Sequence, residues 1–226
     1  MKIEYISNNG YIVETDKAVY VFDFVDGLLP SSYFRKEKPF IFFVSNNNAE
    51  YYSQGIYFYR KTVIYSFDIP QDPYNQVFKM SPGDMVHLGF AKVHAFSSTR
   101  EGVSYLIEED DHKIFHAGSL NNWHYQDNYS EKRVQMETEN FLGIIDSLKA
   151  YLPIDVMIFP VNASLGYNYD HGAKRAVRLL KPKHFFPTQF NRVSLIEEFV
   201  NWAANEKETK FYFPKYTNED FEVQND

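Results

Sequence analysis

Apolar and polar residues alternate in short runs over the first 118 residues, and small polar turns separate these runs. Runs of this kind, rich in β-branched and aromatic side chains, predict β-strands. Turn residues at Asn8-Asn9-Gly10 and Asp16-Lys17 predict hairpins near the start of the chain. Strands are expected at 2–7, 10–15, 18–24, 40–45, 62–67, 85–98, 102–109 and 112–118.

The run at 40–45, FIFFVS, differs from its neighbours because it does not alternate. A strand without alternation is typical of a position buried on both faces of a sheet. The run ends abruptly at Ser45 and three consecutive asparagines, followed by Ala49, Glu50 and Tyr51. Asparagine favours turns because its side chain bonds to nearby backbone, so a polar loop is expected after the strand.

Helical spacing of apolar residues is found in the second half of the chain. It predicts a helix over 138–153, which Pro153 ends. Two more helices are predicted, one over 170–182 with Asp170 as its N-cap, and one over 194–204. The third begins with a capping box formed by Ser194 and Glu197. Strands are expected at 156–161, 184–190 and 210–213, and an acidic, loosely ordered tail over 216–226.

This order, many antiparallel strands and then strand–helix units, predicts an α/β or α+β protein. Two sheets are expected to pack together with helices outside them. The chain has no internal repeat and no linker, so residues 1–226 are predicted to form one domain.

Composition narrows the function classes. The 226 residues are 44% hydrophobic and 18% aromatic, which suits a sizeable core. The net charge of −7 disfavours nucleic acid as a partner, because phosphate binding needs a basic face. The absence of cysteine excludes disulfides, thiolate metal sites and cysteine nucleophiles. The start lacks a signal-peptide pattern and no apolar run is long enough to span a membrane, so a soluble cytoplasmic protein is expected.

Several segments follow one another in an order known from one protein family. They are YISNNGYIVET, VYVFDF with Asp23, FFVSNNNAEYYS, STREGVSYLIEEDDHKIFHAGSLNNWHY and DVMIFPVNASLGYNYDHGAKRAVRLLKPKHFFPTQF. Through them the chain, from about residue 1 to about residue 205, resembles the metallo-β-lactamase fold superfamily. The resemblance is to its metal-dependent hydrolase branch, which includes proteins similar to ascorbate-6-phosphate lactonase.

The resemblance implies a four-layer αββα sandwich with metal ions held by loops along one edge of the two sheets. Members of the family are mostly hydrolases that use zinc, manganese or iron. A bound metal lowers the pKa of a water molecule, so that hydroxide attacks an ester, lactone, amide or phosphoester. Histidine and carboxylate side chains supply the ligands.

The same resemblance shows what this chain lacks. The positions of the family's ligands, here called the lost-ligand positions, are occupied by Asn46, Asn48, Glu50, Tyr51, Ser119 and Gln189. Amides are poor zinc ligands, and tyrosine ligates only after it loses a proton with a usual pKa of about 10. The segment 97–100, where many members have another histidine, holds none. Of the six, only Glu50 is a ready anionic donor, so no metal and no cofactor is predicted.

The remaining candidates lie near the HAG segment. His116, Asn121, Trp123 and His124 are predicted to line the vacated pocket, although for His116 a role as a hydrogen-bonded loop anchor is favoured. His171 lies beside Asp170, where capping is favoured over acid/base chemistry.

Two functions from different classes follow. In the first, the chain is a pseudoenzyme that binds a small molecule or a partner in the vacated cleft, and its aromatic-rich composition is compatible with a homo-oligomer. In the second, it is a hydrolase with an atypical metal site or with metal-free chemistry from Glu50 and a pocket histidine. The simultaneous replacement of five ligands favours the first hypothesis, because removing even one ligand weakens a three- or four-ligand site.

Overall fold

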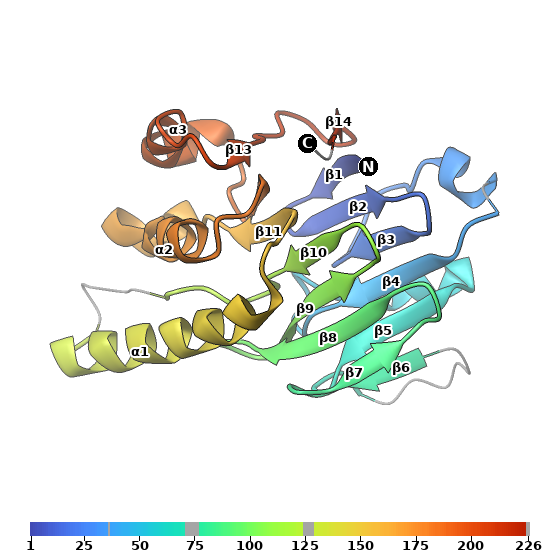
Figure 1. The fold of residues 1–226 in the computed structure, drawn as a ribbon, viewed down its shortest axis with the longest axis horizontal. Coiled ribbons are helices and arrows are strands. Elements are labelled where there is room, and N and C mark those ends of the chain that lie inside the picture. The colour runs from blue at the N-terminus through green and yellow to red at the C-terminus, as the bar shows by residue number, and fades with distance from the viewer. Residues whose placement is uncertain (36, 71–76, 124–128, 225–226) are drawn as a thin grey trace.

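The computed structural model describes residues 1–35, 37–70, 77–123 and 129–224. Its centre is a pair of seven-stranded sheets packed face to face, with the long helices on one side (Figure 1). The α+β sandwich with two sheets and external helices, as predicted, is therefore confirmed.

The first sheet has the order β14-β1-β2-β3-β4-β5-β6. Its β14-β1-β2-β3 part is antiparallel, and the pairs from β3 to β6 are parallel. A turn at Asn8 and Asn9 joins β1 to β2, with Asn8 at a φ of 20°. The strands are β1 Lys2–Ser7, β2 Gly10–Glu14, β3 Val19–Phe22, β4 Phe40–Val44, β5 Thr62–Ser66, β6 Val77–Met80 and β14 Asp220–Glu222.

The second sheet has the order β13-β12-β11-β10-β9-β8-β7. Its β7-β8-β9-β10 part is antiparallel, and the pairs from β10 to β13 are parallel. The predicted run at 85–98 is divided into two strands by a turn that contains Gly89 at a φ of 84°. The strands are β7 Met85–His87, β8 Lys92–Ser97, β9 Val103–Glu108, β10 Lys113–His116, β11 Val156–Pro160, β12 His184–Thr188 and β13 Lys210–Phe211.

Three α-helices cover the outer face of the second sheet (Figure 1), and they are α1 Glu131–Leu148, α2 His171–Leu180 and α3 Glu197–Ala203. The outer face of the first sheet is covered by two 3-10 helices, η1 Ser31–Arg35 and η2 Gln54–Tyr59. In the part of the chain that the structure describes, the fourth layer of the sandwich is thus built from short 3-10 turns. The remaining 3-10 helices are η3 Lys149–Tyr151, η4 Ala163–Asn168 and η5 Val193–Ile196.

The β4 strand is buried on both faces, as its unbroken apolar run predicted. Phe43 faces the core between the sheets, where its ring lies 5.1 Å from Phe22 and 5.2 Å from Tyr105. Phe42 faces the opposite way, into a second cluster under η1 and η2, where its ring lies 5.6 Å from Tyr59. Strand β4 therefore contributes side chains to the apolar clusters on both faces of the first sheet.

Two helix starts and one helix cap differ from the prediction. The first helix begins at Glu131, because Ser130 caps it by accepting a hydrogen bond from the Arg133 backbone, and its first turns are largely exposed. The capping box at Ser194 is wrong, since η5 occupies that segment and α3 begins only at Glu197. Asp170 stands at the N-cap of α2 but makes no side-chain cap, and its carboxylate pairs with Lys174 at 2.5 Å.

The tail over 216–226 is not loosely held where the structure describes it. Strand β14 pairs with β1, and the backbone of Val223 donates to the Met1 carbonyl at 2.9 Å. Val223 is buried against the inter-sheet core. The acidic sequence concealed this strand, because a short edge strand needs only one apolar residue facing inward.

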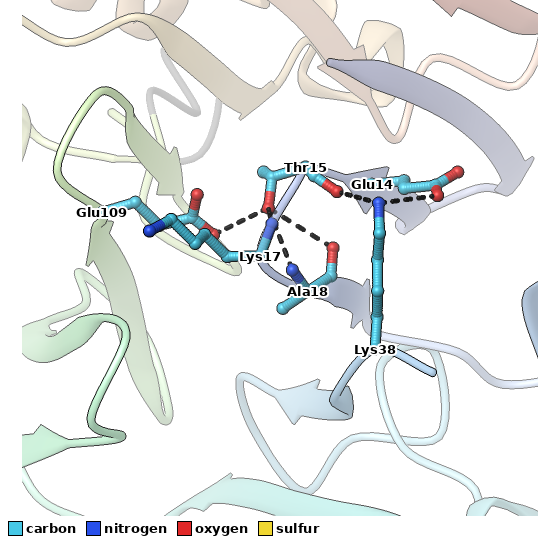
Figure 2. A network of polar contacts seen from close by, with 6 residues as sticks. All are labelled: Glu14, Thr15, Lys17, Ala18, Lys38 and Glu109. Atoms are coloured by element: carbon cyan, nitrogen blue, oxygen red, sulfur yellow. Dashed lines mark hydrogen bonds and ion pairs between the residues drawn. The ribbon is translucent and has the colours of Figure 1, made fainter. Parts of the chain in front are cut away.

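A polar cluster joins the two sheets at the edge where the parallel strands begin (Figure 2). The Glu109 carboxylate, which follows β9, accepts from the Thr15 hydroxyl at 2.8 Å and from the Tyr20 hydroxyl at 2.5 Å. Lys38 donates to the Thr15 carbonyl at 2.6 Å and pairs with Glu14 at 3.3 Å. We call this set the closed edge.

No helix in the described ranges is long and apolar enough to span a membrane.

Candidate functional site

A polar pocket of about 230 Å³ lies at the opposite edge, where β4, β10, β11 and β12 end. All six lost-ligand positions line it together, as their order along the chain predicted. Parallel strands end at one edge of a sheet, so loops distant in sequence meet there. Among the residues that the structure describes, the lining is Asn46, Asn48, Glu50, Tyr51, Arg100, Glu101, Ser119, Trp123, Asn162, Ser164 and Gln189.

Asparagine side chains shape the loop after β4. The Asn46 side-chain oxygen accepts from the Asn48 backbone at 2.9 Å, and the Asn48 oxygen accepts from the Glu50 backbone at 3.0 Å. These two consecutive Asx-type turns explain the asparagine run. Gly102, at a φ of 84°, packs against this loop so closely that an added Cβ would lie 2.0 Å from the Ser45 carbonyl oxygen.

A chain of side-chain hydrogen bonds crosses the pocket from one sheet to the other. Gln189, after β12, donates to the Tyr51 hydroxyl at 2.5 Å, and its oxygen accepts from Asn162 at 3.1 Å. The Asn162 oxygen in turn accepts from the Ser164 hydroxyl at 2.7 Å. Four side chains of the lining thus bond to one another.

The Tyr51 phenol stays protonated in this setting. Burial raises its pKa above the ordinary value, and the negative charges of Asp23 and Glu50 raise it further. Arg100 and the hydrogen bond from Gln189 lower this pKa, but they do not offset the effect of burial. A neutral phenol is a hydrogen-bonding group and not a metal ligand.

The other wall of the pocket is built around Ser119. Its hydroxyl donates to the Glu101 carbonyl at 2.7 Å and lies 2.8 Å from the Ser98 hydroxyl. The indole of Trp123 donates to the Ser119 carbonyl at 3.0 Å, and the Arg100 guanidinium lies 4.0 Å from the centre of the Trp123 ring. Ser119 is thus held by neighbours on both sides, and the Trp123 ring packs against the Arg100 guanidinium.

No family model matches this sequence, and no curated protein matches it. Solved structures do match. A novel metallo hydrolase, Igni18 from Ignicoccus hospitalis, shares 15% identity at a TM-score of 0.67 over 99% of both chains. The metallo-beta-lactamase fold protein YhfI from Bacillus subtilis shares 11% identity at a TM-score of 0.64 over 98% of this chain and 99% of its own. An isothiocyanate hydrolase from Delia radicum gut bacteria shares 11% identity at a TM-score of 0.61 over 99% of both chains.

The chain has the metallo-β-lactamase fold. At these identities the likeness concerns the fold alone, so the lactonase-like branch stays a prediction.

The residues present do not fit the metals that the metallo-β-lactamase fold implies. The lost-ligand positions offer amides, a hydroxyl, a protonated phenol and one carboxylate, Glu50. In the described ranges, no group of three or more histidine, aspartate or glutamate side chains is placed to hold an ion. Zinc, manganese and iron need several histidine or carboxylate ligands at once.

Two residues expected in the lining lie behind it. His116 is 2% exposed and Asn121 is 0% exposed, and neither lines the pocket. Asn121 is packed against α2, where a Cβ on Gly172 would lie 1.9 Å from its oxygen. Trp123 lines the pocket as predicted, whereas His124 lies outside the described residues.

His116 belongs to a buried polar pair under the site. Its Nε2 lies 3.5 Å from an Asp23 oxygen, and its ring stacks on Phe22 at 4.7 Å. Asp23 also accepts from the Ser45 backbone at 2.7 Å and from the Ser45 hydroxyl at 2.8 Å. Burial raises the pKa of Asp23 to about 8 and lowers the pKa of His116 to about 3. The pair therefore anchors the start of the Asn46 loop from below.

Four residues of the lining escaped sequence analysis, namely Arg100, Glu101, Asn162 and Ser164. The signal for Asn162 was its place directly after a buried strand, followed by a serine two positions later. Arg100 and Glu101 precede Gly102, whose positive φ marks the tight approach to the first loop. Neither Asp170 nor His171 lines the pocket.

A second cleft, of about 460 Å³, lies between β8 and α1, with His94, Glu139 and Tyr151 in its wall. It contains none of the lost-ligand positions. The larger cleft is therefore not the candidate site. The candidate site is identified by the strand ends that converge on the smaller pocket.

Proposed function

We propose that this metallo-β-lactamase-fold protein is a pseudoenzyme that binds a small polar molecule in the vacated pocket. One observation carries the proposal, namely the hydrogen bond from Gln189 to Tyr51 at 2.5 Å. Two positions where the family has metal ligands contact each other directly, and this hydrogen bond joins loops of both sheets. The pocket that remains is lined almost wholly by polar side chains, which favour a polar ligand.

The alternative, a hydrolase, has weaker support. The acid/base pair expected for it consists of Glu50 and a pocket histidine, but His116 lies behind the pocket, and His124 is outside the described residues. We also propose the cytoplasm as the location, and a homo-oligomer stays a prediction.

Metal content tests the proposal. The purified chain is incubated with zinc, manganese or iron, passed through gel filtration and analysed by mass spectrometry. Near-zero occupancy is expected. The positive control restores the family's ligands at all six lost-ligand positions (Asn46→His, Asn48→His, Glu50→Asp, Tyr51→His, Ser119→Asp, Gln189→His) and should retain metal if it folds, which circular dichroism checks.

A stoichiometric ion in the unaltered chain would overturn the proposal. Turnover of lactones, esters or phosphodiesters above the level of a Glu50→Ala variant would also overturn it, because a carboxylate at the one anionic lost-ligand position would then be at work.

A further inference from the structure

The Tyr51 hydroxyl has a proton to donate into the pocket. Its oxygen accepts from Gln189, and no acceptor for its own proton is found among the described residues. Tyr51 is 5% exposed and lines the pocket, so water has little access to it from elsewhere. A buried donor of this kind is normally paired, which points to an acceptor atom on a ligand.

Arg100 provides donors on the same side of the pocket. Its guanidinium is supported by the Trp123 ring at 4.0 Å, which limits its rotation. A guanidinium has five N–H donors in a planar fork that matches a carboxylate. Arg100 also lies close enough to Tyr51 for its charge to act on that hydroxyl. Donors from two loops therefore converge on one region.

Among the described residues of the lining, the other charged side chains are the carboxylates of Glu50 and Glu101. Glu50 is close enough for its charge to act on Tyr51, so opposite charges flank the same hydroxyl. Two carboxylates against one guanidinium disfavour a simple anion, because its negative charge would meet a surplus of negative charge. A ligand with both signs of charge avoids this repulsion.

The volume limits the ligand's size. The pocket, at about 230 Å³, is smaller than typical ligand pockets of roughly 300–1,000 Å³. A ligand of the size of a small amino acid suits a pocket of this volume.

We propose that the pocket binds a small zwitterion of the amino acid class. Its carboxylate is held by Arg100 and the Tyr51 hydroxyl, and its ammonium group is held by Glu50. This inference rests on the proposed function, since it names the ligand class for the same pocket.

Isothermal titration calorimetry with glycine, L-alanine and L-serine tests the inference. Acetate and ethylamine serve as truncated probes, each with one of the two charges. At least one amino acid should bind, and each truncated probe should bind at least about tenfold more weakly, because one charged contact is missing. Acetate that binds as tightly as glycine would overturn the inference, as would the absence of binding by all three amino acids.

Matched variants locate the binding. Arg100→Gln should weaken amino acid binding at least about tenfold. Arg133→Gln is its control, because Arg133 also stacks on an aromatic ring, Tyr129 at 3.6 Å, but lies on α1 outside the pocket. Glu50→Gln should weaken binding similarly, with the exposed Glu198→Gln as its control. Equal losses in a control and its pocket variant would overturn the assignment.

Failure here and failure of the proposed function are distinguishable. A chain that takes up no metal and binds no amino acid contradicts only the zwitterion. A chain that binds metal contradicts the pseudoenzyme itself.

Discussion

The closed edge and the pocket edge use similar polar residues in opposite ways. At the closed edge, one buried carboxylate, Glu109, accepts from the Thr15 and Tyr20 hydroxyls and so joins the two sheets; Figure 2 shows its contact with Thr15. At the pocket edge, Gln189 and Tyr51 also join the two sheets, but a polar cavity remains beside them. The first arrangement serves stability, and the second combines a link between sheets with space for a ligand.

The largest effect is expected at the wall of the pocket edge. Gly102→Ala should lower the free energy of unfolding by roughly 3–5 kcal/mol, because the new Cβ would meet the Ser45 oxygen at 2.0 Å with φ at 84°. Urea denaturation followed by circular dichroism measures it. Gly143→Ala is the control, since nothing lies within 4 Å of its Cβ and it lies inside α1, where alanine should stabilise slightly. Equal stability of the two variants would contradict the close approach.

The next effect concerns the closed edge. Glu109→Ala removes the acceptor of the buried Tyr20 hydroxyl and leaves the Thr15 hydroxyl with its longer bond, at 3.4 Å, to the Ala18 carbonyl, so a loss of about 2–3 kcal/mol is expected. The neighbouring Asp110→Ala should change stability by less than about 0.5 kcal/mol, because its ion pair with Lys17 is exposed. If Glu109→Ala were as mild as Asp110→Ala, the edge would not be a stabilising tie.

The third prediction concerns how the free energy of unfolding depends on pH through Asp23 and His116, which lie under the pocket. The pKa of Asp23 is raised by burial to about 8, above the value of about 3.9 in an unfolded chain. Its contribution to stability is therefore complete below about pH 4 and is lost as the pH rises through 8. The pKa of His116 is lowered by burial to about 3, so its contribution is present above about pH 6.5 and is lost as the pH falls through 3.

Between about pH 6.5 and 8, the contribution of Asp23 to stability changes with pH, whereas that of His116 is constant. Stability should fall there by at most about 1.4 kcal/mol per pH unit. The Asp23→Asn variant should show a flatter profile in urea denaturation at pH 6.5, 7.5 and 8.5. An unchanged slope in that variant would assign the effect to other groups.

The smallest effect on stability is expected for Tyr51→Phe. It removes the acceptor for Gln189 beside a cavity that water can fill, so a loss of about 1 kcal/mol is expected. A double-mutant cycle with Gln189→Leu should show a coupling of similar size. Additive losses would mean that the two side chains do not support one another, and the comparison of the two edges would fail.

Sequence patterns predicted the strands better than they predicted the ends of the helices. The unbroken run of β4 requires two apolar layers, and the structure supplies both. The start of α1 was hidden because its first turns are exposed and carry no apolar stripe, so only the cap at Ser130 marks it. Short 3-10 helices such as η2 were also not predicted, since its six residues are too few for a period to be recognised.

The candidate site could be predicted only in part. The lost-ligand positions were found because each follows a strand in the family's order, and strand ends converge. The contributions of Arg100 and Asn162 depend on how loops from different strands face each other, which no local pattern encodes. His116 was considered for the lining because of its nearness in sequence, although an anchoring role was favoured; in the structure it is buried against Asp23 and Phe22.

Trp123 gives the pocket an optical signal of its own. The chain has two tryptophans, and the other, Trp202, lies on α3 among Phe199 and Phe211. In a Trp202→Phe background, the remaining indole emission comes from a ring that contacts Arg100 and donates to the Ser119 carbonyl. Any molecule that draws the guanidinium away from this ring should change the intensity or wavelength of that emission, so occupancy of the pocket can be followed in solution without a label.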